Sequence, residues 1–173
     1  MSEPRIRLLD DTSINKIAAG EVIDRPSSVV KELVENSLDA GASRIEVEIE
    51  AGGVGKIRVT DDGCGMSEQD VRLAVLRHAT SKIRSSDDLF TVESMGFRGE
   101  ALPSIASVAK FSLISRQSGN PLGTRLEISG GQLQDVVECG AEVGTVVLVS
   151  DLFFNTPPRL KFMKTAAAAS AHI

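Results

Sequence analysis

The sequence predicts an α+β fold, a two-layer sandwich in which helices cover a mixed, mostly antiparallel sheet. Two observations support this prediction. Segments of helical periodicity surround a hairpin pattern in the first part of the chain, and from Phe111 onward apolar and polar residues alternate, as in strands joined by short turns. In addition, a length of 173 residues and an apolar content of 42% suit one domain with its own core.

The helix expected after Pro26 is the element around which the candidate site is organised. Gly41 is well placed to end it in the left-handed conformation. Its apolar face is made of Val30, Leu33, Val34, Ser37 and Leu38. Glu32 and Asn36 lie four residues apart, one above the other, beside that face. The carboxylate could act as a general base and the amide oxygen could bind magnesium, although the pair alone also fits a solvated polar edge.

Three further segments have helical periodicity. The first follows the possible caps Thr12 and Ser13, and its spaced positions are Ile14, Ile17, Ala18, Glu21 and Val22. The second opens at Ser67 and runs through Val71, Ala74, Val75 and His78. The third leads from Ala101 through Leu102, Ile105, Ala106 and Ala109. We expect these segments to join the helical layer.

The strand pattern begins with a hairpin. Ile45, Val47 and Ile49 alternate with glutamates, residues 51–55 form a glycine-rich turn, and Ile57 and Val59 alternate with polar residues. The short turn predicts antiparallel pairing, which sets the acidic face of the first strand opposite Lys56 and Arg58.

Four more strands are predicted at residues 110–116, 123–129, 132–138 and 144–150. Short turns containing glycine separate them. Consecutive strands with short connections favour an antiparallel meander.

Charge and composition exclude several classes of protein. A net charge of −5 and the absence of Trp and Tyr argue against a nucleic-acid footprint over the whole chain. The sequence has no apolar run of membrane-spanning length and no secretory signal, and Cys64 and Cys139 lack metal-type spacing, so we expect an intracellular protein with reduced thiols. Residues 166–173 resemble the opening of a helix, which indicates a piece of a longer protein.

A nucleotide site is a reasonable hypothesis from the residues alone. No Walker loop is present, and no Gly-x-Gly-x-x-Gly follows a strand, yet glycines follow Asp61 and again precede the helix at Ala101. Glycines let the backbone approach a ligand, and a helix N-terminus presents amide groups to phosphate. An ionised Asp61 offers acceptors, which suits the amino group of adenine. Taken singly, these features also fit an ordinary turn and a tight bend.

Together, the motifs resemble in order those of the GHKL ATPases, the superfamily of gyrase, the ninety-kilodalton heat-shock chaperone, sensor histidine kinases and MutL proteins. The motifs are Glu32 with Asn36, Asp61 with Gly63 and Gly65, Gly96 with Gly99, and Gly144 with Thr145. Longer strings resemble MutL mismatch-repair proteins in particular: residues 17–22 (IAAGEV), 32–41 (ELVENSLDAG), 77–82 (RHATSK), 96–102 (GFRGEAL) and 154–159 (FNTPPR). The resemblance runs from about residue 8 to the end.

The resemblance implies a role for each matching position. Glu32 matches the general base that activates water, Asn36 the Mg²⁺ ligand, and Asp61 the carboxylate that reads adenine. Thr145 matches the residue that supports Asp61 from the sheet, and Gly65 the glycine against which adenine lies. The edge of the nucleotide pocket would be formed by Thr80, Ser81 and Lys82. The phosphate-binding lid hinge would be formed by Gly96, Phe97, Arg98, Gly99, Glu100, Ala101 and Leu102.

The family's function is then the expected one, that of a Mg²⁺-dependent ATPase whose ATP-bound lid and N-terminal arm close and drive dimerisation. Residues 1–24 would be the arm and first helix, 25–165 the ATPase domain, and 166–173 the start of a helix leading to a second domain that is not in this sequence. Because that domain contributes a lysine to the γ-phosphate in this family, hydrolysis by this chain should be very slow.

Implied partners are an identical or related MutL-type subunit, the mismatch-recognition protein MutS and a downstream nuclease or helicase, with weak DNA contact by this chain and no membrane. The location would be cytoplasmic in bacteria and nuclear in eukaryotes. Two alternatives are a GHKL kinase that phosphorylates a protein histidine and a nucleotide-responsive binding module without chemistry of its own.

Overall fold

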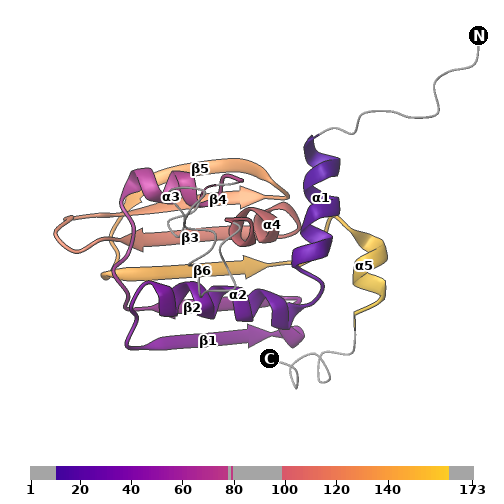
Figure 1. Cartoon of the computed structure of the whole chain (residues 1–173), viewed down its shortest axis with the longest axis horizontal. Coiled ribbons are helices and arrows are strands. Elements are labelled where there is room, and N and C mark those ends of the chain that lie inside the picture. Colours follow the sequence, from indigo (N-terminus) through magenta and orange to yellow (C-terminus); the bar gives the residue numbers. More distant parts are fainter. Residues whose placement is uncertain (1–10, 78, 80–98, 164–173) are drawn as a thin grey trace, which may run out of the picture.

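The computed structural model describes residues 11–77, 79 and 99–163. In this part of the chain six strands form one sheet, with helices along it (Figure 1). The helical elements are α1 (Asp11–Val22), α2 (Pro26–Asp39), the 3-10 turn η1 (Ala51–Gly53), α3 (Glu68–Ala74), α4 (Ala101–Ser107) and α5 (Pro157–Lys161). The strands are β1 (Ile45–Glu50), β2 (Lys56–Asp61), β3 (Lys110–Arg116), β4 (Gly123–Ser129), β5 (Gln132–Cys139) and β6 (Gly144–Ser150). The predicted strands are confirmed, whereas α5 was not predicted.

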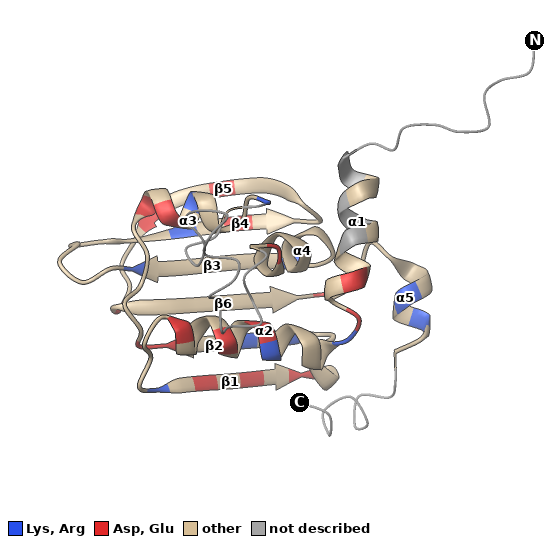
Figure 2. Cartoon of the chain, in the orientation of Figure 1, with Lys and Arg blue, Asp and Glu red and all other residues tan. Residues whose placement is uncertain are grey.

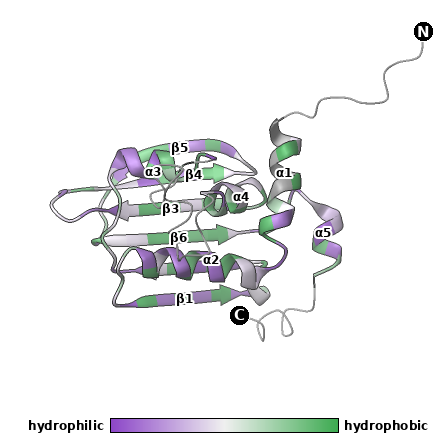
Figure 3. Cartoon of the chain, viewed as in Figure 1, coloured by the Kyte–Doolittle hydropathy of each residue, from purple (hydrophilic) through white to green (hydrophobic). Residues whose placement is uncertain are grey.

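The strands are arranged in the order β1-β2-β6-β3-β4-β5, and each of these pairings is antiparallel. The sheet is therefore antiparallel throughout its described pairs rather than mixed. The predicted meander is confirmed for β3, β4 and β5 and is wrong for β6, which lies between β2 and β3. The side chains explain this position. β6 carries four consecutive apolar residues, Val146 to Val149, suited to the middle of a sheet, whereas β5 is largely exposed and suits an edge (Figure 3).

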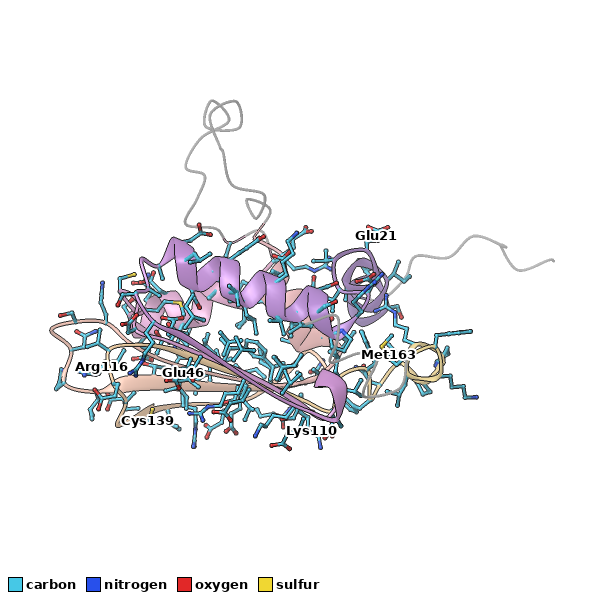
Figure 4. The ribbon with its side chains drawn as sticks, turned by 90° about the horizontal axis from the view of Figure 1, so that it is seen from below. Glu21, Glu46, Lys110, Arg116, Cys139 and Met163 are labelled. Atoms are coloured by element: carbon cyan, nitrogen blue, oxygen red, sulfur yellow. The ribbon has the colours of Figure 1, made fainter. Side chains whose placement is uncertain are left out.

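Helices α2, α3 and α4 lie on one side of the sheet, whereas α5 lies beyond its end, so the two-layer sandwich is confirmed (Figure 4). Val29 and Leu33 of α2 and Ile105 of α4 are buried in one cluster with the inward-facing residues of the strands. The strand members of this cluster are Ile57, Val59, Phe111, Leu113, Leu126, Ile128, Val147 and Val149. Every second residue of β3 is buried, as expected for a strand with one covered face.

Two expected apolar faces differ from the observed ones. Leu38 is 61% exposed at the end of α2, and Ile17 is 58% exposed on α1, which instead buries Ala19 and is followed by the buried Ile23. The exposure of Ile17 follows from the place of α1, because this helix packs against α4 at the end of the helical layer and does not lie flat on the sheet. Periodicity predicted a helix here, but it did not predict which side of the helix meets the core.

The hairpin prediction is confirmed in its register and its charges. Glu48 stands opposite Arg58, and Glu50 stands opposite Lys56. Arg58 Nη1 donates to Glu48 Oε1 at 3.0 Å, and Lys56 forms an ion pair with Glu50. Acidic residues occupy alternate positions along β1, and most of its ribbon is coloured as acidic (Figure 2). These pairs are largely exposed, so they favour the register more than they stabilise the domain.

Candidate functional site

Asp61 is the last residue of β2, and its carboxylate is held from two sides. Ser37 Oγ donates to Asp61 Oδ2 at 2.8 Å, and the backbone N–H of Gly63 donates to Oδ1 at 2.9 Å. Ser37 Oγ also lies 3.1 Å from the carbonyl oxygen of Leu33, but a charged acceptor makes the stronger bond. Two ionised oxygens can accept about four hydrogen bonds, so Asp61 keeps acceptor capacity for a ligand.

The neighbouring Asp62 has a different task. It accepts hydrogen bonds from the backbone N–H groups of Ser43 and Arg44, both at 2.8 Å, and from Ser43 Oγ at 2.6 Å. The bonds from the Ser43 side chain and the Arg44 backbone lower the pKa of Asp62 to about 2. Asp62 therefore fixes the loop between α2 and β1, and of the two adjacent carboxylates Asp61 is the one available to a site.

Gly65 lies where no other residue fits. Its φ is +67°, and a Cβ at this position would lie 2.0 Å from the carbonyl oxygen of Arg116. The loop after β2 consequently presses against the end of β3, and the backbone N–H of Met66 donates to Ser115 Oγ at 2.9 Å. This contact alone requires glycine, whatever else lies against the loop.

Thr145 stands directly opposite Asp61 in the β2–β6 pairing and opposite Ser115 in the β3–β6 pairing. Directly opposed residues share a face of the sheet, so the three side chains lie on the side that the helices cover. Ser115 Oγ is 2.9 Å from Thr145 Oγ1 and 2.9 Å from the carbonyl oxygen of Gly144. The structure thus places Thr145 beside Asp61, the residue that the resemblance expects it to support.

Glu32 and Asn36 are both half-buried on α2, one turn apart. Ser37, the residue after Asn36, is 3% exposed and makes the bond to Asp61 described above. This bond fixes α2 against the end of β2, so the helix that carries Glu32 and Asn36 lies next to the strand that carries Asp61.

Part of the predicted site lies outside the described residues. This applies to Thr80, Ser81, Lys82, Gly96, Phe97 and Arg98. Gly99 and Glu100 immediately precede α4, and Ala101 and Leu102 form its first turn, half-buried. The backbone N–H of Ser104 donates to the Glu100 carbonyl at 3.0 Å, which closes that turn.

Sequence reasoning missed the supporting roles of Ser37, Asp62 and Ser115. Helical periodicity groups Ser37 with the apolar face of its helix and predicts no function for its hydroxyl. The role of Ser115 could have been predicted from the strand pattern, because Ser115 is a polar residue at an inward-facing position of β3, two residues beyond Leu113. A buried hydroxyl at a core position requires hydrogen-bond partners, and here those partners belong to the candidate site.

Within the described residues, no group of three or more His, Cys, Asp or Glu side chains is arranged to hold a metal ion. No helix in the same part of the chain has the length and apolar character needed to cross a membrane. A pocket on the uncovered face of the sheet, lined among others by Lys110, Glu127 and Leu148, includes none of the described site residues.

Comparison with known proteins gives consistent results. A family model described as "Histidine kinase-, DNA gyrase B-, and HSP90-like ATPase" matches residues 24–134. The DNA mismatch repair protein MutL of Geobacter sulfurreducens is 58% identical over 98% of this chain, which covers 28% of that protein. The MutL of Acidobacterium capsulatum is 57% identical over 98% of this chain, which covers 25% of it. The chain thus spans about a quarter of the length of these relatives.

Solved structures agree with the sequence comparison. The Aquifex aeolicus MutL ATPase domain complexed with ADP superposes with a TM-score of 0.71 at 40% identity, over 87% of this chain and 52% of that one. The N-terminal domain of a DNA repair protein gives the same TM-score at 36% identity, over 86% of this chain and 42% of the other.

Proposed function

Because the chain belongs to the histidine kinase-, DNA gyrase B- and HSP90-like (GHKL) ATPase family, as the N-terminal ATPase region of a MutL mismatch-repair protein, we propose that it binds ATP with Mg²⁺ and hydrolyses it. The observation that carries the proposal is the bond between Ser37 and Asp61. It joins the helix with the candidate base and metal ligand to the strand with the candidate base-reading carboxylate. The ADP complex of the Aquifex aeolicus relative supports a nucleotide of this kind.

In this proposal Asp61 accepts a hydrogen bond from the amino group of adenine. Its contacts with Ser37 and Gly63 hold both carboxylate oxygens in place before the ligand arrives. A pre-organised acceptor loses little conformational entropy on binding. Thr145, directly opposite in the sheet, supports the same edge of the base.

Glu32 acts as the general base in this proposal and orients the attacking water. Asn36, a half-buried residue, would hold Mg²⁺ through its amide oxygen, a ligand type that suits a hard cation. Mg²⁺, when bound, offsets negative charge on the triphosphate. A single protein ligand suffices, because Mg²⁺ keeps several waters and binds phosphate oxygens. Phosphoryl transfer to water depends chiefly on positioning and charge neutralisation, so a general base and an amide can supply the protein's share of the chemistry.

The remaining roles are proposed from the resemblance. Thr80, Ser81 and Lys82 would line the edge of the pocket, Gly65 would let adenine lie against the backbone, and residues 96–102 would form the lid hinge at the phosphates. Residues 25–165 would make the ATPase unit, and ATP would close the lid and the arm at residues 1–24. The closed state would favour pairing with a second MutL-type subunit and signal to MutS and to a nuclease or helicase.

The decisive experiment compares two adjacent carboxylates. Asp61→Asn should lower the affinity for a non-hydrolysable ATP analogue by about tenfold to 150-fold, since a hydrogen bond to a charged group contributes about 1.5–3 kcal/mol. Asp62→Asn is the matched control and should bind near the wild-type affinity, because Asp62 holds the 43–44 loop. Calorimetric titration of each variant with the ATP analogue, in the presence of Mg²⁺, measures both affinities. Equal losses for the two variants would show that Asp61 has no special role.

A further inference from the structure

Ser115 places one buried oxygen in contact with three polar groups. Its side chain is 1% exposed, and Oγ lies 2.9 Å from each of the Met66 backbone nitrogen, the Gly144 carbonyl oxygen and Thr145 Oγ1. These groups come from the loop after β2 and from the first two residues of β6. Ser115 therefore links the loop after β2, which contains Gly65, to the first residues of β6.

The protons at this point can be assigned by counting. A backbone N–H can only donate and a carbonyl oxygen can only accept, so Ser115 accepts from Met66 and donates its single proton to Gly144. A hydroxyl oxygen has two lone pairs, and one of them is still free. In the contact between the two hydroxyls, Thr145 must therefore be the donor and Ser115 the acceptor.

This assignment has a consequence for Thr145. Once its only proton points to Ser115, Thr145 Oγ1 offers nothing but lone pairs to a ligand. Thr145 and Asp61 are directly opposed in neighbouring strands, with Cβ atoms about 4.5–5.5 Å apart in such pairs. Their outward groups are then all acceptors, the Thr145 hydroxyl oxygen and the Asp61 carboxylate.

We propose that Ser115 is a positioning residue for base selection, because it fixes the Thr145 hydroxyl as an acceptor beside Asp61. The proposal rests on the proposed function and specifies its substrate: a purine with an amino group at carbon 6 can donate to this edge. A purine with a carbonyl at that position presents an acceptor to two acceptors there, and its only donor on the six-membered ring at this edge, the N1–H, lies one ring position away, so it should bind less tightly. Discrimination of this kind comes from buried acceptors left without a donor.

The test measures affinities of the whole chain for two non-hydrolysable nucleotides with Mg²⁺, the adenosine and the inosine triphosphate analogues. These differ at carbon 6, which carries an amino group in one and a carbonyl in the other, and in the proton that inosine carries on N1. Wild type should prefer the adenosine form. In Ser115→Ala the Thr145 hydroxyl is free to turn and donate to the inosine carbonyl, so the ratio of affinities should fall by about fivefold, roughly the free energy of one neutral hydrogen bond. Thr145→Val should reduce the ratio as well, and adding Ser115→Ala to it should change nothing further.

Ser107→Ala is the matched control, because Ser107 is also buried, at 4% exposure, and its hydroxyl donates to a backbone carbonyl at 2.8 Å. It should lower the melting temperature and keep the affinity ratio. Thr145→Ser keeps the hydroxyl and should keep the ratio too. If Ser115→Ala does not fold, Ser115→Cys makes the same comparison, since a thiol is a weak acceptor of similar shape.

The outcomes separate the two proposals. A wild-type chain that binds neither nucleotide contradicts the proposed function itself. A wild-type chain that prefers adenosine while Ser115→Ala keeps the ratio, and merely loses stability as Ser107→Ala does, overturns the role of Ser115 and leaves the proposed function standing. Additive effects of Ser115→Ala and Thr145→Val on the ratio would also overturn it.

Discussion

The guanidinium group of Arg159 occupies the space that a side chain at Gly20 would need. A Cβ at position 20 would lie 1.9 Å from Nη2 and 2.9 Å from Cζ of Arg159. The same guanidinium lies 5.4 Å from the centroid of the Phe153 ring, and its Nη1 donates to the Ile23 carbonyl at 3.4 Å. α5 therefore holds the C-terminal end of α1 through one side chain, and the absence of a side chain at Gly20 allows it.

This relationship predicts a change of sign in a double-mutant cycle. In an Arg159→Ala background, Gly20→Ala should stabilise the domain by about 1 kcal/mol, because alanine is the better helix former and the space is empty. With Arg159 present, the new methyl group displaces the guanidinium from Phe153 and Ile23, so the gain should vanish or reverse. Urea unfolding of the four proteins measures the coupling. The same effect of Gly20→Ala in both backgrounds would disprove the contact.

A second prediction concerns the hydroxyl that holds Asp61. Ser37→Ala should lower ATP affinity by up to about tenfold, because Asp61 loses the donor that fixes Oδ2. Ser28→Ala is a control on the same helix, since the Ser28 hydroxyl also donates to a carboxylate, that of Asp24, away from the candidate site. Titration with an ATP analogue should show a loss for Ser37→Ala alone. Equal affinities for the two variants would mean that Asp61 needs no support.

Acid sensitivity provides a third prediction. The pKa of Asp62 is lowered to about 2 in the folded chain, below the ordinary value of 3.8 for an aspartate. A group whose pKa is depressed by folding stabilises the fold above its unfolded pKa, and that stabilisation is lost as the pH falls from about 4 toward 2. Asp62→Asn should therefore lose less thermal stability than wild type between pH 6 and pH 3. Asp135→Asn, on the exposed edge strand, should behave as wild type.

A fourth prediction separates ATPase from kinase chemistry. With γ-labelled ATP, the label should appear as free phosphate and not on protein, and the 173-residue chain should release it more slowly than a longer protein that extends beyond residue 173. Glu32→Ala in the longer protein should bind ATP and release no phosphate. Label retained on protein favours the kinase alternative. Unchanged turnover in Glu32→Ala would remove Glu32 from the mechanism.

Local patterns in the sequence were sufficient for the strands, whereas the pairing of Asp61 with Thr145 was expected only from the family resemblance. Alternation fixes a strand, and the charges of Glu48 and Arg58 fix the hairpin register, because both depend on neighbours in the chain. The position of β6 and the exposed face of α1 depend on which distant segments compete for the same edge or surface. Ser37 and Ser115 were not recognised for the same reason, since each acts through a partner far away in the sequence.

The central position of β6 has a consequence for how this chain folds. β2 and β3 become neighbours of a strand that begins at residue 144, so during synthesis both keep an unpaired edge until nearly the whole domain has left the ribosome. Pairing over such long sequence separations makes folding slow. A polypeptide truncated before Gly144 would expose the unpaired backbone edges of β2 and β3, which favour aggregation. A chaperone that shields nascent strands should therefore raise the yield of the domain more than it raises its final stability.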